Sequence, residues 1–327
     1  MPAARQFGPL SAVLTWALLS LAAGWYGAWI GLGGRPLAAA LSVFSFLLLV
    51  MLLFAARGVT EKIVARLGSA AGILLGGSLL LAYLIYLLGT NTFAIARAGV
   101  VMALILAPLA LALSAERKPA GAWQDFLIVA GVWACAKFLP AAWLWPYASG
   151  KPAHIFTILL MVAIGIAVFL LTRRVSGVDY NIGWGANWLL YIIGSFLLFA
   201  VIAIPLGMAI HFVQFAPSWK AAGSLPLVAV GILIFTAWPE EFLFRGLLQN
   251  MLSQRLRSDF AAILLASVLF GLSHITNGHT PNWRYAALAS IAGLFYGWVW
   301  RKTGSIFASA MVHALVDATW HFFFRTL

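Results

Sequence analysis

The stretch LPLVAVGILIFTAWPEEFLFRGLLQ, residues 225–249, contains the features that decide how this chain folds. Its first half has no charged residue, and the stretch exceeds the roughly 20 apolar residues that a helix needs to cross a bilayer. Two adjacent carboxylates, Glu240 and Glu241, and one guanidinium, Arg245, interrupt it. A charged side chain at the centre of a membrane costs about 3 kcal/mol on insertion scales. These three residues therefore need a structural or functional reason to be there.

The whole chain has the composition of a membrane protein. Of its 327 residues, 64% are hydrophobic and 9% are charged, whereas soluble domains have about 25% charged residues. This excludes a water-soluble protein, and the same hydrophobicity excludes a disordered one. The net charge of +12 does not indicate nucleic-acid binding, because the basic residues are scattered between apolar runs and form no basic stripe. The single cysteine, Cys135, excludes an intrachain disulfide and a cysteine metal cluster.

Apolar runs long enough to span a bilayer recur along the chain, and we count about eleven of them. We therefore predict an all-α fold, a polytopic transmembrane helical bundle. The predicted spans are residues 11–32, 37–56, 69–89, 92–114, 125–146, 153–172, 187–212, 224–254, 260–277, 283–300 and 304–324.

The basic residues in the connecting loops predict the orientation of the bundle. With a cytoplasmic N-terminus, twelve of them fall inside: Arg5, Arg57, Lys62, Arg66, Arg117, Lys118, Arg173, Arg174, Arg255, Arg257, Arg301 and Lys302. Five fall outside: Arg35, Lys151, Lys220, Arg284 and Arg325. Cytoplasmic loops of membrane proteins carry the excess of Lys and Arg. The pattern predicts an N-in, C-out protein, which we expect in a bacterial inner membrane.

A polar, glycine-bearing connection at residues 173–186 divides the runs into two groups. We predict an N-terminal six-helix membrane module of unknown role over residues 1–180. We predict a catalytic membrane domain over residues 181–327. The scarce acidic residues point to the second group, because three of the eight, Glu240, Glu241 and Asp317, lie inside its apolar runs.

Helical geometry gives the two adjacent carboxylates different surroundings. Glu241 and Arg245 are four residues apart, so they share one helix face and can pair. Glu240 is rotated from Glu241 by about 100° and is less available to Arg245. One carboxylate is therefore expected to be structural and the other free to take a proton from water. The alternative is a buried cluster of ion pairs that locks helices together.

Two further apolar runs carry ionisable residues. The ninth run contains FGLSH, residues 270–274, in which Phe270 precedes His274 by four residues. His274 and Glu240 each lie 17 residues from Arg257 in the intervening turn, so they sit at similar depth in an antiparallel pair. The eleventh run places His313 and Asp317 on one helix face, with His321 one turn further on.

The three motifs E-E-x-x-x-R, F-x-x-x-H and H-x-x-x-D together resemble the CPBP intramembrane protease family, also called the Abi or CAAX prenyl endopeptidase-like family. The resemblance covers about residues 224–325 and does not extend to the first six helices. It implies an intramembrane endopeptidase whose substrate is a membrane-associated or C-terminal-signal-bearing protein. The implied partners are that protein or peptide and the lipid bilayer, without nucleic acid.

The resemblance also implies a role for each matching residue. Glu240 would activate a water molecule with the help of His274, while Glu241, Arg245 and Phe270 would support the site. His313 and Asp317 occupy the positions that stabilise the developing oxyanion. The sequence departs here from the family variant that has asparagine at the position of Asp317. An ionised Asp317 cannot donate a hydrogen bond to an oxyanion.

Two alternatives remain beside this reading. No metal cofactor is favoured, since the chain lacks H-E-x-x-H, but Glu240, His274 and His313 would be the ligands of a zinc site. An ion-coupled transporter would also place ionisable residues inside the membrane. A non-catalytic immunity or scaffold protein would retain them for packing.

Overall fold

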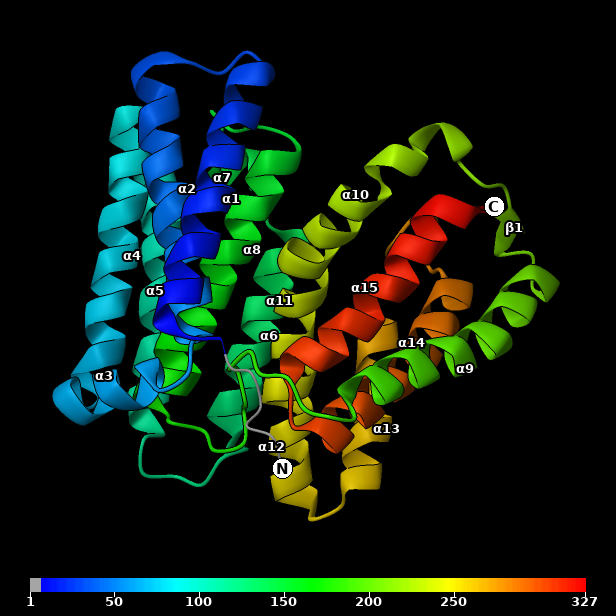
Figure 1. Cartoon of the computed structure of the whole chain (residues 1–327). Coiled ribbons are helices and arrows are strands. Elements are labelled where there is room, and N and C mark those ends of the chain that lie inside the picture. The colour runs from blue at the N-terminus through cyan, green and yellow to red at the C-terminus, as the bar shows by residue number, and fades with distance from the viewer. Residues whose placement is uncertain (1–6) are drawn as a thin grey trace. The chain divides into compact units, whose positions relative to one another are not determined.

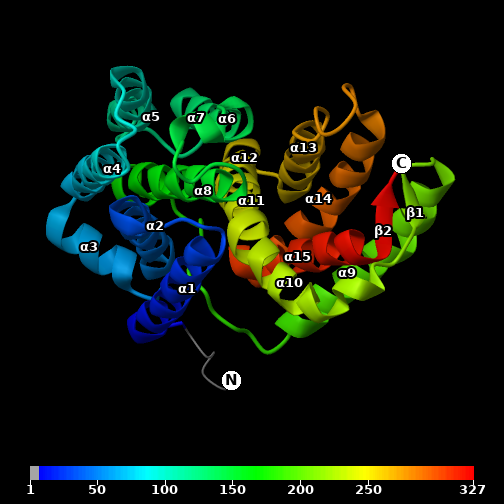
Figure 2. The ribbon, with the colours of Figure 1, turned by 90° about the horizontal axis from the view of Figure 1, so that it is seen from above.

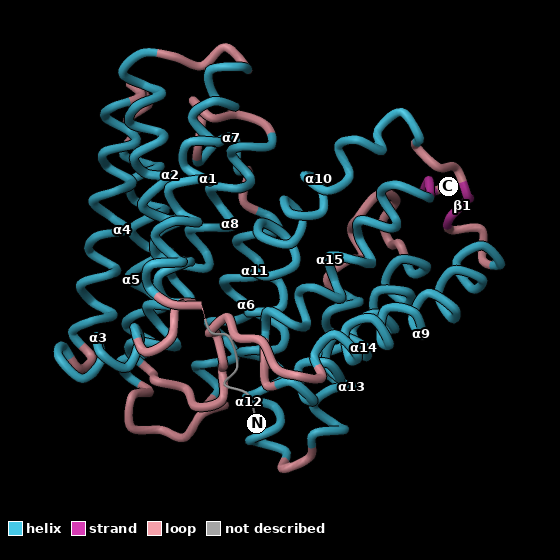
Figure 3. The backbone as a smooth tube through the Cα atoms, in the orientation of Figure 1, coloured by secondary structure: helices cyan, strands magenta, loops and turns pink. Residues whose placement is uncertain are grey.

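The computed structural model describes residues 7–327, and most of this part of the chain is helical (Figure 3). Residues 1–6 lie outside the described residues, and they include Arg5, one of the basic residues predicted to be cytoplasmic. The described part of the chain divides into two compact units, residues 7–176 and Gly177–Leu327. All-α architecture is confirmed, and each predicted apolar run overlaps at least one helix in the described part of the chain.

The N-terminal unit is a helical bundle. Its helices are α1 (Pro9–Trp29), α2 (Gly34–Phe54), α3 (Val59–Leu67), α4 (Ala70–Gly89), α5 (Ile95–Ser114), α6 (Trp123–Phe138), α7 (Ala141–Leu144) and α8 (Lys151–Gly165), which continues as the π-helix η1 (Ile166–Thr172). The helix formed by α8 and η1 contacts α2, α4, α5, α6 and α7, and these surround it when the unit is seen from above (Figure 2). Nearly all of its residues are buried, so it is the central helix of the bundle.

A buried ion pair joins two distant parts of this unit. Arg173 Nε lies 2.7 Å from Asp125 Oδ1, and Arg173 Nη2 donates to Asp125 Oδ2 at 2.8 Å. Asp125 also accepts the backbone N–H groups of Gly121 and Ala122. The guanidinium donates in addition to the carbonyl oxygens of Ala115, Lys118 and Pro119. The pair therefore fixes the end of η1 against the loop between α5 and α6.

The C-terminal unit contains α9 (Trp188–Ala209) and one long irregular helix. The long helix begins after the 3₁₀ turn η2 (Trp219–Ser224) and runs through α10 (Leu225–Ile232), η3 (Leu233–Ala237), α11 (Trp238–Glu241), η4 (Phe242–Gln249) and α12 (Asn250–Leu256). Three helices follow: α13 (Asp259–Leu272), α14 (Trp283–Thr303) and α15 (Ile306–Phe323). Strand β1 (Val213–Phe215) pairs antiparallel with β2 (Phe324–Thr326), so the end of the chain is held beside the loop after α9 (Figure 1).

Eight helical segments among the described residues are long and apolar enough to cross a membrane. They are Pro9–Trp29, Gly34–Phe54, Ala70–Gly89, Ile95–Ser114, Lys151–Thr172, Trp188–Ala209, Ala222–Leu256 and Ile306–Phe323. The protein is thus an integral membrane protein with several spans, while the total of eleven and the orientation stay predictions.

Three predicted runs are not among these eight segments, each for a physical reason. The run 125–146 breaks between α6 and α7, where Pro140 disfavours helix for the residue before it. The run 260–277 is helical only as Asp259–Leu272, which has 14 residues. The run 283–300 lies in helix α14, which has 21 residues but is less apolar in composition than the eight segments.

Loss of the Asp125 carboxylate is expected to destabilise the N-terminal unit. Asp125→Ala leaves the buried guanidinium of Arg173 without its counter-charge, and breaking a buried pair in this way costs about 3–5 kcal/mol. The melting temperature in detergent should fall clearly below that of the wild type. The control is Arg301→Gln, which breaks a pair with Asp259 whose side chains are 54% and 42% exposed. Exposed pairs contribute about 0–1 kcal/mol, so an equal fall in both variants would contradict the expectation.

Close packing of α13 against α14 predicts a second effect on stability. An alanine Cβ at Gly271 would collide with the carbonyl oxygen of Ala286 and lie 2.8 Å from the backbone nitrogen of Ser290. Because these are backbone atoms, Gly271→Ala must push the helices apart, at about 1–3 kcal/mol. In the control Gly194→Ala, on α9, a Cβ has no neighbour within 4 Å. Thermal unfolding should show a loss for the first variant alone, and equal melting temperatures would refute this packing.

Candidate active site

A cavity of about 350 Å³ lies inside the C-terminal unit. The four residues predicted to be catalytic all line it: Glu240, His274, His313 and Asp317. The remaining lining comes from α9, α10, η3, α13, α14, α15 and the turn after α13: Phe199, Ile232, Thr236, Phe270, Asn277, Tyr285, Leu288, Ala289, Ala292, Tyr296, Val316, Trp320 and His321. The fold therefore brings together residues that are up to 122 positions apart, from Phe199 to His321.

The long helix places Glu240 and Glu241 between two π-helical segments. Segment η3 ends just before α11, and η4 begins just after it. Pro239, within α11, has no N–H to donate, and π turns inside helices are frequent at functional sites. The two adjacent carboxylates therefore differ in their exposure. The Glu240 side chain is 33% exposed at the cavity, whereas that of Glu241 is fully buried.

Glu241 is the centre of a buried network. Its Oε1 lies 3.2 Å from Nη1 of Arg245, and its Oε2 lies 3.2 Å from Nε, as the spacing of four residues predicts. From α15, the hydroxyl of Ser309 donates to Oε2 at 2.6 Å. The ring of His313 approaches Oε1 with Nδ1 at 3.0 Å. Three partners therefore compensate the buried charge, and two of them come from another helix.

Arg245 connects the same network to α14. Its Nη2 donates to the carbonyl oxygen of Gly293 at 3.0 Å, and its guanidinium lies 4.6 Å from the ring centroid of Phe270. One turn further on, Gln249 Nε2 donates to the carbonyl oxygen of Gly297 at 3.2 Å. A Cβ at Gly297 would lie 2.5 Å from Gln249 Oε1. The two glycines of α14 thus leave room for two polar side chains of η4.

His313 stands between the buried network and the cavity. Since Nδ1 faces Glu241, Nε2 is left for the cavity, where it lies 3.5 Å from Asp317 Oδ2 and 4.0 Å from Glu240 Oε2. The ring stacks on Tyr296 with centroids 4.6 Å apart and an interplanar angle of 16°. Phe270 meets it edge-on at 5.6 Å. The orientation of His313 is therefore fixed from both sides.

His274 does not lie within a spanning helix, contrary to the prediction. Helix α13 ends at Leu272, and a polar turn begins at Ser273. The apolar pattern misplaced the helix end because Ile275 continues the run past it. In the turn, His274 Nδ1 lies 2.8 Å from the carbonyl oxygen of Phe270. A carbonyl can only accept, so Nδ1 carries the proton and Nε2 of the neutral ring is able to accept one.

Several residues of the site lie outside the three sequence motifs. Ser309 is four residues before His313, so it extends the stripe of His313, Asp317 and His321 by one turn, and that spacing was the signal available in the sequence. Tyr285 and Tyr296 are tyrosines in a chain with eight of them, and no spacing marks them. His321 is exposed and lines the cavity.

The described residues contain no group of three His, Cys, Asp or Glu side chains placed to hold a metal ion. Glu240, His274 and His313, the predicted ligands of a zinc site, line one cavity but do not form such a group. In each ring Nδ1 is engaged, that of His313 with Glu241 and that of His274 with the carbonyl oxygen of Phe270. Nε2 is therefore the nitrogen of each ring that is left for a water molecule, a substrate or a metal ion.

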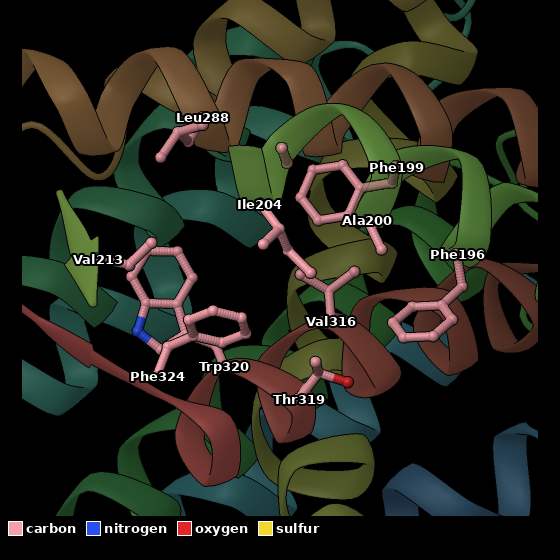
Figure 4. A pocket seen from close by; sticks show the side chains of 11 residues that line it. Phe196, Phe199, Ala200, Ile204, Val213, Leu288, Val316, Thr319, Trp320 and Phe324 are labelled. Atoms are coloured by element: carbon pink, nitrogen blue, oxygen red, sulfur yellow. The ribbon is translucent and has the colours of Figure 1, made fainter. Parts of the chain in front are cut away.

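A smaller apolar pocket of about 40 Å³ adjoins the cavity (Figure 4). It shares Phe199, Leu288, Val316 and Trp320 with the cavity. Its other lining residues are Phe196, Ala200, Ala203, Ile204, Val213, Thr319 and Phe324. One side of the polar site is therefore continuous with an apolar surface on α9 and α15.

Comparison with known proteins finds a family match in the C-terminal unit. No curated protein and no solved structure matches the chain. The matching segment includes all three motifs and none of the N-terminal unit. Residues 222–319 match the family of type II CAAX prenyl endopeptidase Rce1-like proteins, which confirms the resemblance to CPBP-type CAAX proteases predicted from the motifs.

Proposed function

We propose that this protein hydrolyses a peptide bond of a membrane-associated or C-terminal-signal-bearing protein with a water molecule activated by Glu240 and His274. The family match supports an intramembrane protease of the CAAX type in general. One observation carries the finer proposal. Glu240 faces the cavity and pairs with no arginine among the described residues, while the adjacent Glu241 is bound by Arg245, Ser309 and His313.

The reaction begins with a water molecule between Glu240 and the unprotonated Nε2 of His274. Glu240 takes one proton from this water while the oxygen attacks the carbonyl carbon of the substrate. The carbonyl π electrons move to its oxygen, which becomes an oxyanion within reach of the Nε2–H of His313. When the tetrahedral intermediate collapses, the C–N bond breaks and the proton held by Glu240 passes to the leaving amine. The products are a carboxylic acid and an amine, and no other reactant is needed.

The supporting residues act by holding His313. Because Glu241 accepts from Nδ1–H, the proton on Nε2 of a doubly protonated ring is directed at the cavity. Arg245 and Ser309 hold the Glu241 carboxylate in turn. Preorganised donors of this kind stabilise a transition state without having to reorient during the reaction. Phe270 packs against the rings of both histidines and keeps them in place.

The membrane arrangement completes the proposal. We place the catalytic domain at residues 181–327 and the six-helix module at 1–180, with eleven spans, a cytoplasmic N-terminus and a location in a bacterial inner membrane. Helices α6, α13 and α14 would then cross as parts of the bundle rather than as independently stable spans. The family match does not favour the ion-coupled transporter or the non-catalytic scaffold.

The Glu240 carboxylate is expected to be essential for cleavage and dispensable for folding. Glu240→Gln keeps the side-chain volume but removes the base, so the cleavage rate should fall by at least about 10²-fold, while the melting temperature stays at the wild-type value. The measurement uses proteoliposomes with a quenched-fluorescent peptide that ends in a CAAX sequence, in prenylated and unprenylated forms. The matched control is Glu241→Gln, which disturbs the buried network and should lower both the melting temperature and the rate. Wild-type cleavage by Glu240→Gln would refute the proposed function.

Chelators are expected to leave the activity unchanged if Glu240 and His274 act without a metal. The same assay with 1,10-phenanthroline or EDTA should give the rate of the untreated protein, with a zinc-dependent protease inhibited in parallel as the positive control. Loss of activity on chelation, with recovery on addition of zinc, would instead establish a zinc protease with ligands Glu240, His274 and His313.

A further inference from the structure

The proposed reaction leaves the oxyanion with fewer donors than it needs. Oxyanion sites in acyl-transfer enzymes use preorganised hydrogen-bond donors aimed at the developing charge. His313 supplies one donor from Nε2, because its Nδ1 faces Glu241. Asp317, the neighbour of Nε2 at 3.5 Å, is an acceptor when ionised. A second donor must come from elsewhere in the cavity lining.

Tyr285 is a cavity residue with a hydroxyl and a fixed position. It lies in the first turn of α14, where its backbone N–H donates to the side chain of the N-cap residue Asn282 at 3.0 Å. Its ring stacks on Trp320, with centroids 5.9 Å apart and an interplanar angle of 21°. The ring of His274 lies 5.0 Å away. The phenol is therefore held beside the histidine that we propose to assist the water.

The surroundings of the Tyr285 hydroxyl place it in the reactive part of the cavity. The side chain of Asn277 is hydrogen-bonded to it, and Asp317 and Glu240 line the same cavity. A phenol oxygen can accept one hydrogen bond and still donate its own proton. With the Asn277 amide as donor, the Tyr285 proton stays available to a substrate oxygen.

The other tyrosine of the lining is less suitable. Tyr296 is 1% exposed, and its ring stacks on His313. The guanidinium of Arg245 lies 5.4 Å from its ring centroid. Tyr296 therefore packs within the buried network behind His313 rather than beside His274.

We propose that Tyr285 is a catalytic residue whose hydroxyl donates the second hydrogen bond to the oxyanion, beside Nε2 of His313. The hydroxyl keeps its proton through the whole cycle, so no bond to the tyrosine forms or breaks. In this arrangement Tyr285 supplies the donor that an amide at position 317 would provide. The inference rests on the proposed function, because it assigns a role within the same hydrolysis.

Tyr285→Phe tests the role of the hydroxyl with the ring preserved. Removing one oxyanion donor lowers kcat by about 10²–10³-fold, and KM should change by less than about threefold, since the donor acts on the transition state rather than on the bound substrate. The assay is cleavage of the quenched-fluorescent CAAX peptide in proteoliposomes. Tyr191→Phe on α9, outside the cavity lining, is the control for loss of a tyrosine hydroxyl and should keep the wild-type kcat.

Asn277→Ala separates catalysis from anchoring of the turn. This substitution removes the hydrogen bond between the Asn277 side chain and the Tyr285 hydroxyl but leaves that hydroxyl in the cavity. We therefore expect kcat to fall by no more than about tenfold. A kcat that falls equally in Asn277→Ala and Tyr285→Phe would show that the hydrogen bond only anchors the turn, and the inference would be wrong.

A second measurement does not depend on turnover. A peptide phosphonate, which mimics the tetrahedral intermediate, should bind Tyr285→Phe at least about tenfold more weakly than the wild type, whereas binding of the uncleaved peptide to the Glu240→Gln background is unchanged by the added Tyr285→Phe. Unchanged phosphonate binding would overturn the inference. The proposed function is tested separately, by whether the wild type cleaves the peptide and Glu240→Gln does not.

Discussion

The C-terminal unit is organised around one buried charge, the carboxylate of Glu241. A carboxylate away from water is costly unless it is paired and hydrogen-bonded, and here Arg245, Ser309 and His313 meet it. Each partner adds a geometric requirement. Arg245 also binds a carbonyl oxygen of α14, and Ser309 and His313 belong to α15. The long helix, α14 and α15 are therefore fixed in rotation and register, and removal of Arg245 leaves the buried carboxylate without its ion pair.

This constraint produces the asymmetry between two adjacent glutamates. Because Glu241 turns inward to its partners, Glu240 turns toward the cavity, where its Oε2 lies 4.0 Å from Nε2 of His313. The structural carboxylate thus sets the position of the available one and of the histidine that faces it. The packing of the helices and the proposed chemistry both depend on this network. Loss of Glu241 is therefore expected to lower stability and activity, and loss of Glu240 to lower activity alone.

A buried carboxylate of the N-terminal unit is compensated in the same way. Asp125 and Arg173 are fully or almost fully buried, and their remaining hydrogen-bonding positions are occupied by backbone groups of the loop before α6. Of the eight acidic residues in the chain, Asp125 and Glu241 are the two that are completely buried among the described residues, and each is paired with an arginine. In a chain so poor in acids, a carboxylate without an arginine partner inside an apolar helix is the informative exception, and Glu240 is such a carboxylate.

The sequence by itself determined the helices, the membrane environment and the identity of the motif residues. Apolar run length and the i, i+4 spacing of Glu241 and Arg245 are local properties, which the backbone geometry of one helix translates directly into structure. The end of α13 at Leu272, the break at Pro140, the contact of Ser309 with Glu241 and the place of Tyr285 in the cavity lining were not readable in this way. These depend on which face each helix turns to its neighbours. Only the tertiary structure decided that, because the pairing of a buried charge with groups 68 and 72 residues away is a property of packed helices and not of the chain around it.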